Sequence, residues 1–428
     1  PPSRDLATRL GLARGAVVAA FEMLVADGFA EARVGAGTFV AGAVPHVPVV
    51  GPVAAPLPER AALPGDLGLA LADRRTLDQF RAILHRQMAR PPAAQFAYGD
   101  ARGDAGLRAE VADYLRMARG VRCHADQILL TNGTQGALDL IARAVLGPGD
   151  AVWVEDPGYP MAKAALCEMR LIPVPVDAQG LDVAAGIRSC PGARAAYVTP
   201  SHQFPTGVAL SMPRRLALLD WAAQAGAWII EDDYDSEFHY AGRPTACVQG
   251  LDPHDRTIYI GTFTKSLFPG LRIGYLILPP DLVAPFTIAR TQQDGHPASI
   301  AQLVLARFIQ GGHFGAHIRL MRNIYAERMR ILARLIEKDL AGLVEARVPS
   351  GGLQMPCLLT CDLAEARVVN AAARAGLGLT GLSALHATAR PQPGFLIGFA
   401  AFTPTELESG VHILARVLHD LKTAAHPD

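Results

Sequence analysis

Apolar and polar positions in the first forty residues follow two different periods. In residues 3–29, apolar side chains recur every three or four positions on both sides of Gly11, which predicts two helices joined by a turn. Ser3 stands where it could cap the first of them. Residues 29–40 then alternate across a Gly-Ala-Gly turn, which predicts a short hairpin. Two helices and a hairpin give the outline of a winged helix, although a small helical cap on an enzyme has the same pattern.

From about residue 67 onwards, short apolar runs alternate with helical segments. The runs predict buried strands at residues 127–131, 151–155, 171–176, 195–200, 228–233, 257–262 and 273–278. Strands that alternate with helices favour an α/β fold with a mainly parallel, doubly wound sheet, in which ligands bind at the carboxyl ends of the strands. Residues 300–428 carry long amphipathic helices and few strands, so we expect a smaller α+β part there.

A stretch rich in proline, alanine and valine separates the two patterns. It shows no period, which predicts a semi-extended linker at residues 43–66. The chain begins with Pro1 and Pro2 rather than methionine, so we expect the first helix of the winged helix to precede Pro1. The expected organisation is a winged-helix domain at 1–42, the linker, and an effector domain at 67–428, with a large part at about 98–290 and a small part at about 300–428.

Charge and cysteine content narrow the class of protein. Lysine and arginine together number 40, and so do aspartate and glutamate, so net charge alone indicates neither a nucleic-acid nor a membrane-surface protein. The six cysteines are scattered, which favours neither a disulfide framework nor a zinc site, and we expect no bound metal. The sequence has no apolar run of transmembrane length and no signal peptide, so we expect a soluble, cytoplasmic protein.

Lysine is rare in this chain, which makes its positions informative. Only four of the 40 basic residues are lysines, and three of them lie in segments that read as helix surface or tail. Lys265 instead lies in GTFTKSLFPGLRIGY, residues 261–275, among hydroxyl and apolar neighbours. Lysine can lose its proton in a protein, whereas arginine cannot. Burial and the nearby Arg272 would lower the pKa of Lys265, as a Schiff-base amine requires.

Three further motifs follow predicted strands. In TNGTQGALDL, residues 131–140, backbone N–H groups and Thr134 could cradle a phosphate, although an ordinary helix cap looks the same. Tyr159 could stack on a flat ring or pack over the core. The acids at 231–235 could bind magnesium, face a protonated ring nitrogen, or cap a helix. Together with the Lys265 amine, these parts fit one ligand, pyridoxal phosphate.

The motifs also carry a resemblance to a known family. Residues 67–428 resemble a fold-type I aminotransferase, and the whole chain resembles the MocR subgroup of GntR-type transcription regulators. The motifs that carry it are PPSRDLATRLGL, GAGTFV, YGDARGDAGLR, TNGTQGALDL, EDPGYP, TPSHQFPTG, EDDYDSEFHY and GTFTKSLFPGLRIGY. The resemblance implies a regulator whose winged helix binds operator DNA. Its aminotransferase-like domain would sense pyridoxal phosphate or an amine effector through aldimine exchange at Lys265.

Two other functions stay open beside the regulator. One is an active pyridoxal-phosphate-dependent aminotransferase that acts on an amino acid or an amine. The other is a protein that binds the cofactor only to sense or buffer it. Steady turnover of an amino donor would indicate the enzyme, and a gel shift with operator DNA would indicate the regulator.

The resemblance also implies roles for individual residues. Lys265 forms the Schiff base with pyridoxal phosphate, Asp232 pairs with the pyridinium nitrogen, and Tyr234 reaches the ring hydroxyl. Tyr159 stacks on the ring, and His202 belongs to the same cofactor site. The residues that hold the phosphate are Gly133, Thr134, Gln135, Thr262, Thr264 and Arg272, with Tyr98 from the neighbouring subunit of a head-to-tail homodimer. The residues assigned to DNA are Ser3, Arg4, Arg14 and Gly37, and the one assigned to the effector is Arg390.

The chain departs from the family pattern at three places. Plain aminotransferases have asparagine before the Pro-Thr-Gly turn, where this chain has Phe204, so we do not expect full transaminase turnover. Arg390 is the nearest candidate for the arginine that clamps an amino-acid carboxylate, so we expect an effector other than a simple α-amino acid. The expected recognition helix offers Arg14 alone, followed by Gly15 and Ala16.

Overall fold

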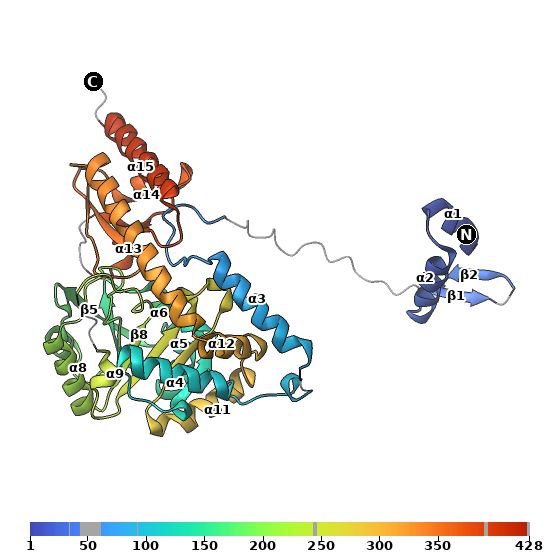
Figure 1. Ribbon diagram of the computed structural model, residues 1–428, viewed down its shortest axis with the longest axis horizontal. Helices are drawn as coiled ribbons and strands as arrows, with labels where there is room; N and C mark the ends of the chain where they lie inside the picture. Colours follow the sequence, from blue (N-terminus) through green and yellow to red (C-terminus); the bar gives the residue numbers. More distant parts are fainter. Residues whose placement is uncertain (34, 43–60, 92, 243–245, 389–392, 426–428) are drawn as a thin grey trace. The chain divides into compact units, whose positions relative to one another are not determined.

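The computed structural model describes residues 1–33, 35–42, 61–91, 93–242, 246–388 and 393–425. The chain divides into two compact units, Pro1–Ala61 and Ala62–Asp428 (Figure 1). Residues 62–66, which the sequence pattern assigned to the linker, belong to the second unit.

The first unit contains two helices and a hairpin. Helix α1 (Ser3–Leu10) ends at Gly11, whose φ of 67° places it in the left-handed region that favours glycine. Helix α2 (Arg14–Ala26) precedes strands β1 (Ala30–Arg33) and β2 (Gly37–Val40), which pair antiparallel. The prediction that Ser3 caps the first helix is wrong, because Ser3 is itself its first residue and Pro2 holds the cap position without a side-chain hydrogen bond.

The second unit is built on an eight-stranded sheet with the order β3-β10-β9-β8-β7-β4-β5-β6. The neighbours β9, β8, β7, β4 and β5 are parallel, whereas β10 runs antiparallel to β3 and β9, and β6 runs antiparallel to β5. The mainly parallel sheet predicted from the sequence is therefore confirmed. The strand bounds are β3 (Ile128–Thr131), β4 (Ala151–Asp156), β5 (Arg170–Asp177), β6 (Gly180–Leu181), β7 (Ala195–Val198), β8 (Trp228–Asp233), β9 (Thr257–Thr262) and β10 (Gly274–Ile277).

Helices cover both faces of this sheet. Successive side chains of a buried strand point to opposite faces, so both faces are apolar and must be shielded from water. In β4, Val152 belongs to one apolar core and Trp153 to the other, where its ring stacks on Trp221 at 3.8 Å. The helices of this part are α3 (Arg74–Ala89), α4 (Ala105–Arg119), α5 (Gly133–Val145), α6 (Pro160–Ala165), α7 (Val183–Ser189), α8 (Met212–Ala225), α9 (Val248–Leu251), α10 (Phe263–Ser266), α11 (Val283–Asp294) and α12 (Ile300–Gln310).

The carboxyl-terminal part adds a smaller antiparallel sheet, with the order β11-β12-β14-β13. Its strands are β11 (Val344–Ala346), β12 (Gln354–Leu359), β13 (Thr380–Gly381) and β14 (Gly394–Gly398), and its helices are α13 (His313–Asp339), α14 (Glu365–Arg374) and α15 (Pro404–Ala425). Helices α13 and α15 lie side by side (Figure 1). None of the helices in the described residues is long and apolar enough to cross a membrane.

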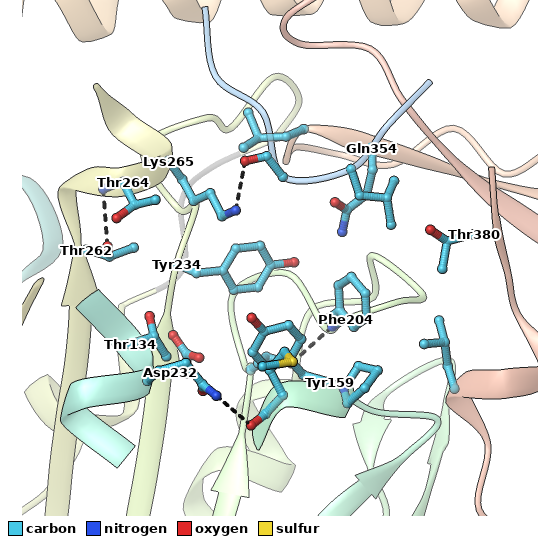
Figure 2. Close-up of a pocket in the computed structure, with 18 of the residues that line it drawn as sticks. Thr134, Tyr159, Phe204, Asp232, Tyr234, Thr262, Thr264, Lys265, Gln354 and Thr380 are labelled. Atoms are coloured by element: carbon cyan, nitrogen blue, oxygen red, sulfur yellow. Dashed lines mark hydrogen bonds between the residues drawn. The ribbon is translucent and has the colours of Figure 1, made fainter. Parts of the chain in front are cut away.

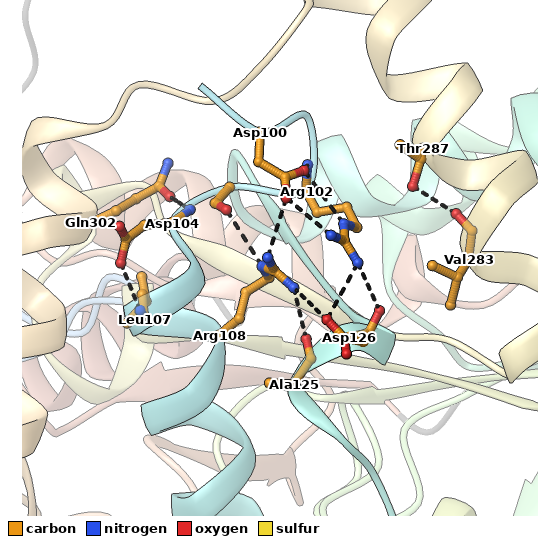
Figure 3. A network of polar contacts seen from close by, with 11 residues as sticks. Asp100, Arg102, Asp104, Leu107, Arg108, Ala125, Asp126, Val283, Thr287 and Gln302 are labelled. Atoms are coloured by element: carbon orange, nitrogen blue, oxygen red, sulfur yellow. Dashed lines mark hydrogen bonds and ion pairs between the residues drawn. The ribbon is translucent and has the colours of Figure 1, made fainter. Parts of the chain in front are cut away.

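A polar network fixes the loop that precedes α4 (Figure 3). Asp100 accepts a hydrogen bond from the backbone N–H of Arg102 at 2.8 Å and from Nη2 of the buried Arg108 at 3.2 Å. Asp104 caps α4 through the N–H of Leu107, and its own N–H donates to Gln302 on α12 at 2.7 Å. The charges of the YGDARGDAGLR motif therefore serve to fold this loop.

Candidate functional site

A cavity of about 410 Å³ lies at the carboxyl ends of the parallel strands. This is where a doubly wound sheet binds its ligands. Asp232 comes from β8 and Thr262 from the end of β9, while Thr199 and Tyr159 follow β7 and β4. The other lining residues are Leu67, Gly68, Thr134, Gln135, Pro160, Met161, Tyr197, Phe204, Tyr234, Thr264, Lys265, Arg272, Leu353, Gln354, Thr380 and Leu385.

Lys265 lies on the short helix α10, directly after β9, and its amine points into the cavity (Figure 2). The neighbouring Leu267 is fully buried and anchors the helix in the core. Nζ of Lys265 donates a 2.8 Å hydrogen bond to the carbonyl oxygen of Gly68. Burial lowers the pKa of Lys265, and the positive charge of Arg272 lowers it further. The negative charges of nearby carboxylates act in the opposite direction. The amine is therefore easier to deprotonate than that of an exposed lysine, as nucleophilic attack on a carbonyl requires.

Asp232 presents an unpaired carboxylate oxygen inside the site. Its Oδ2 accepts a 2.7 Å hydrogen bond from the hydroxyl of Tyr197, whereas Oδ1 is buried without a partner among the described residues. Burial raises the pKa of Asp232 to about 7, and the charges of Asp233 and Asp235 add to this. A buried acceptor of this kind fits a protonated ring nitrogen, which would satisfy Oδ1 and stabilise the charged carboxylate.

The neighbouring acids have other partners. Asp233 points to the opposite face of the sheet, where Arg119 donates to it at 2.9 Å. Asp235 bonds to Nδ1 of His202 at 2.8 Å. Within the described residues no three or more acidic, histidine or cysteine side chains converge on a point that could hold a metal ion. This arrangement favours the ring-nitrogen interpretation of Asp232 over the magnesium alternative.

Anion-binding groups gather at the other end of the cavity. Helix α5 begins at Gly133, and the guanidinium of Arg272 lies within 3.7 Å of the point where a side chain on Gly133 would begin. Arg272 holds this position with a φ of 52° and donates to the carbonyl of Asn132 at 3.2 Å. Oγ1 of Thr264 is buried without a partner among the described residues. A helix N-terminus, a guanidinium and a free hydroxyl together suit a phosphate group.

Two aromatic rings form one wall of the cavity. Tyr159 and Phe204 meet edge to face, with their ring centroids 5.5 Å apart. The adjacent Gln203 turns away from the cavity, since its Nε2 donates to Glu155 at 3.1 Å and to the carbonyl of Pro157 at 2.8 Å. The amide of Gln203 is therefore not a substitute for the asparagine that plain aminotransferases carry at the Phe204 position.

The structure brings most of the predicted cofactor residues together. Those that line the cavity are Thr134, Gln135, Tyr159, Asp232, Tyr234, Thr262, Thr264, Lys265 and Arg272. Gly133 lies beside them, under Arg272. His202 is buried against Asp235 outside the cavity lining, although its backbone carbonyl accepts the hydroxyl of Tyr234 at 3.1 Å.

The remaining predicted residues lie elsewhere. Tyr98 is 97% exposed and touches His296 edge to face at 5.8 Å, in a separate groove. Arg390 falls outside the described residues. In the first unit, Arg4 and Arg14 are exposed on their helices, and the other two predicted DNA contacts are Ser3 and Gly37, at the start of α1 and of β2.

Sequence reasoning missed several lining residues. Tyr197 lies in the apolar run that predicts the strand at 195–200. A phenol inside a buried run needs a hydrogen-bond partner, and this need is a signal that could have identified Tyr197 as a site residue. Gln354 and Thr380 come from the small sheet, and no local pattern placed them opposite Lys265. Gly68 lies just after the expected linker, in a segment without helix or strand periodicity, so no local pattern pointed to it.

Comparison with known proteins agrees with this geometry. Residues 76–368 match the family Aminotransferase class I and II. Among solved structures, the kynurenine aminotransferase of Pyrococcus horikoshii is 27% identical, with a TM-score of 0.76 over 85% of this chain and 92% of that one. The fold and the lysine-centred cavity thus define an aminotransferase-like protein.

Relatives that match nearly the whole chain include regulators. The probable rhizopine catabolism regulatory protein MocR of Rhizobium meliloti is 36% identical over 97% of this chain and 88% of that protein. The HTH-type pyridoxine biosynthesis transcriptional regulator PdxR of Corynebacterium glutamicum is 33% identical over 94% and 87%. The chain belongs to the aminotransferase class I and II family and, within it, to the MocR-type helix-turn-helix transcriptional regulators. The resemblance drawn from the sequence motifs is confirmed.

Proposed function

We propose that this chain is a transcription regulator whose first unit binds operator DNA and whose second unit responds to pyridoxal phosphate or to an amine at Lys265. One observation carries the proposal. The same chain holds a helix-turn-helix unit with Arg14 exposed and a cavity in which the Lys265 amine accompanies an unpaired Asp232 oxygen. Regulators of the same two-part organisation match it over nearly its full length.

Pyridoxal phosphate is the cofactor of this cavity, in keeping with the family and with the residues present. When bound, it supplies an aldehyde, with which a primary amine condenses reversibly and releases water, and an electron-withdrawing ring. In our proposal Lys265 provides the amine and Asp232 holds the proton of the ring nitrogen. Tyr159 covers one face of the ring, and Tyr234 contacts the ring hydroxyl.

The phosphate contacts follow from the same end of the cavity. We assign them to the N-terminus of α5 and to Arg272, with Thr264 as the hydroxyl donor. Gln135 and Thr262 complete the set, the latter by fixing the loop, because its Oγ1 accepts the N–H of Thr264 at 3.1 Å.

The opposite end of the cavity would receive an amine effector. Leu67, Phe204, Leu353 and Leu385 make it largely apolar, and Gln354 provides an amide. Among the lining residues that the structure describes, Arg272 is the one guanidinium, and it belongs to the phosphate end. We therefore propose an amine other than a simple α-amino acid.

The proposal includes a homodimer with a head-to-tail arrangement in the cytoplasm. A dimer presents two DNA-binding units to two half-sites of an operator. The phenol of Tyr98 is almost fully exposed, which suits a contact with a second copy of the chain, and we assign it to the phosphate of the partner.

A gel shift with the full-length chain on the DNA upstream of its own gene tests the proposal. We expect a salt-dependent shift that changes on addition of pyridoxal phosphate, and Arg14→Ala should abolish it. Arg188→Ala removes an exposed arginine of the second unit and should leave it unchanged. The purified protein should be yellow with pyridoxal phosphate, and Lys265→Ala should lose the visible band. A protein whose spectrum and DNA binding both ignore pyridoxal phosphate would overturn the proposal.

A further inference from the structure

Residues 62–72, here called the strap, cross the cavity at the point where the second unit begins. At its start, the carbonyls of Pro64 and Gly65 accept the N–H groups of Gly378 and Gly398, both at 2.8 Å. At its end, the N–H of Leu71 donates to the hydroxyl of Tyr325 at 2.8 Å. The strap is therefore fixed on both sides of its middle, by the small sheet and by α13.

The middle of the strap is held by the reactive lysine. Gly68 lines the cavity, and its carbonyl accepts the hydrogen bond from Nζ of Lys265, drawn as a dashed line at the top of Figure 2. Among the described residues, Nζ has no carboxylate within ion-pair distance. The carbonyl of Gly68 is thus a principal partner of a cation that burial destabilises.

The approach of the two groups requires glycine at this position. Gly68 has a φ of +74°, and a Cβ atom there would lie 2.5 Å from Nζ of Lys265. Any other residue is strained at this φ, and its Cβ atom would push aside the amine, which is the end of a flexible side chain. The contact is therefore specific to this backbone and does not arise from a flexible side chain on the strap.

The hydrogen bond and condensation at Lys265 compete for the same N–H groups. An ammonium has three N–H bonds. After it loses one proton, the neutral amine can condense with an aldehyde: a carbon–nitrogen double bond forms, the aldehyde oxygen leaves as water with the two remaining hydrogens, and the nitrogen carries a single N–H only if the product takes up a proton. The carbonyl of Gly68 then loses most of its donor, and the strap loses its central anchor.

We propose that the strap reports the covalent state of Lys265 to the DNA-binding unit. The inference rests on the proposed function and adds its regulatory step. The strap is the first segment of the second unit, and residues 43–60 join it to the helix-turn-helix unit. Release of Gly68 leaves the hydrogen bonds of Pro64 and Gly65 as the anchors of the strap next to that connection, and so changes the mobility of the segment from which the connection starts.

Hydrogen exchange of the peptide covering residues 62–72 tests the first step on the full-length chain. Pyridoxal phosphate should raise its exchange rate about tenfold, because a hydrogen bond to a charged group contributes at least that factor. Pyridoxine 5′-phosphate has no aldehyde, so it should fill the same cavity without this increase. In Lys265→Ala the strap should exchange fast from the start and respond to neither compound. Equal effects of the two compounds, or an intact response in Lys265→Ala, would overturn the inference.

A second experiment measures the operator affinity of variants without the cofactor. Gly68→Ala should push the amine of Lys265 away from the carbonyl of Gly68, and the strap released in this way should shift operator affinity about tenfold towards that of the protein with pyridoxal phosphate bound. Gly342→Ala is the matched control, since Gly342 has the same φ of +74° but open space where the Cβ atom would lie. Equal operator affinities of these two variants would refute the inference, even if the absorbance band that depends on Lys265 is present. Absence of that band from the unsubstituted protein with pyridoxal phosphate would count against the proposed function instead.

Discussion

The hydroxyl of Tyr197 donates a 2.7 Å hydrogen bond to Oδ2 of Asp232, and both side chains are buried. The bond fixes the carboxylate so that Oδ1 is the oxygen left without a partner among the described residues. A mirror-image pair lies on the other face of the sheet, where Tyr259 donates to Asp233 at 2.5 Å. Only the first pair belongs to the cavity.

These pairs give a matched test of the site. Tyr197→Phe leaves a second oxygen of Asp232 unsatisfied, which disfavours its charged form, so the affinity for pyridoxal phosphate should fall about tenfold. Tyr259→Phe removes the same hydroxyl from the other face and should leave the affinity unchanged. Absorbance titration measures both constants. Equal affinities of the two variants would contradict a role of Asp232 towards the ring nitrogen.

The backbone of Arg272 allows a clean test of the phosphate site. Arg272 and Asp255 are the non-glycine residues of the described chain with positive φ, both 52°. Glycine relieves the backbone strain at either position, so neither variant should lose much stability. Arg272→Gly should nevertheless weaken binding of pyridoxal phosphate about tenfold or more, because it removes a charged hydrogen-bond donor. Asp255→Gly should not, and a matching loss there would point to a general effect on the fold.

Buried carboxyl groups should make the cofactor-free protein less stable as the pH rises. Burial raises the pKa of Glu155, Glu231, Asp232 and Glu237 to about 7, against about 4 in an unfolded chain. A raised folded-state pKa contributes stability that is fully present below the unfolded pKa and is lost as the pH rises through about 7. The midpoint temperature of thermal unfolding should therefore decrease as the pH rises from about 4 to about 8.

Asp232→Asn isolates one of these groups. The asparagine can still accept the hydroxyl of Tyr197 but cannot ionise. Over this pH range the free energy of unfolding should decrease less in the variant than in the parent protein, by about 1 kcal/mol or more. Thermal denaturation at several pH values checks the slope, and identical slopes for the variant and the parent would contradict the raised pKa of Asp232.

Phe204 is the residue to change in a test of catalytic competence. Phe204→Asn introduces the amide that plain aminotransferases carry there, and should speed the half-reaction with an amino donor at least about tenfold, as one placed donor can. Phe204→Leu also removes the ring contact with Tyr159 but adds no donor, so it should show no gain. Single-turnover absorbance of the cofactor measures the rate. A gain in both variants would assign the effect to space in the cavity.

The residues near strand ends were the most predictable part of the site. Lys265 and Asp232 each follow a strongly apolar run, and their chemistry is visible in the local sequence. The direction of β10 was not predicted, although the connection between Thr262 and Gly274 is short for a parallel crossover, which usually takes a dozen or more residues.

The contacts from distant segments could not be predicted from local patterns. Thr380 faces the cavity because β13 pairs with β14, a pairing that no nearby residue specifies. Gly68 belongs to a segment without periodicity, and its role depends on a lysine 197 positions away. To predict which side chains complete a site between two sheets, one must know how those sheets pack against each other.

The place of the strap also affects how fragments of this protein should be cut for expression. The family match begins at residue 76, which is an obvious start for an isolated cofactor-binding fragment. Such a fragment would keep Lys265, Asp232 and Arg272 but would lack the carbonyl of Gly68 and the pairing of Gly65 with Gly398. Its spectra would describe a lysine with a different neighbour. A fragment that starts at residue 62 keeps the amine in its own surroundings.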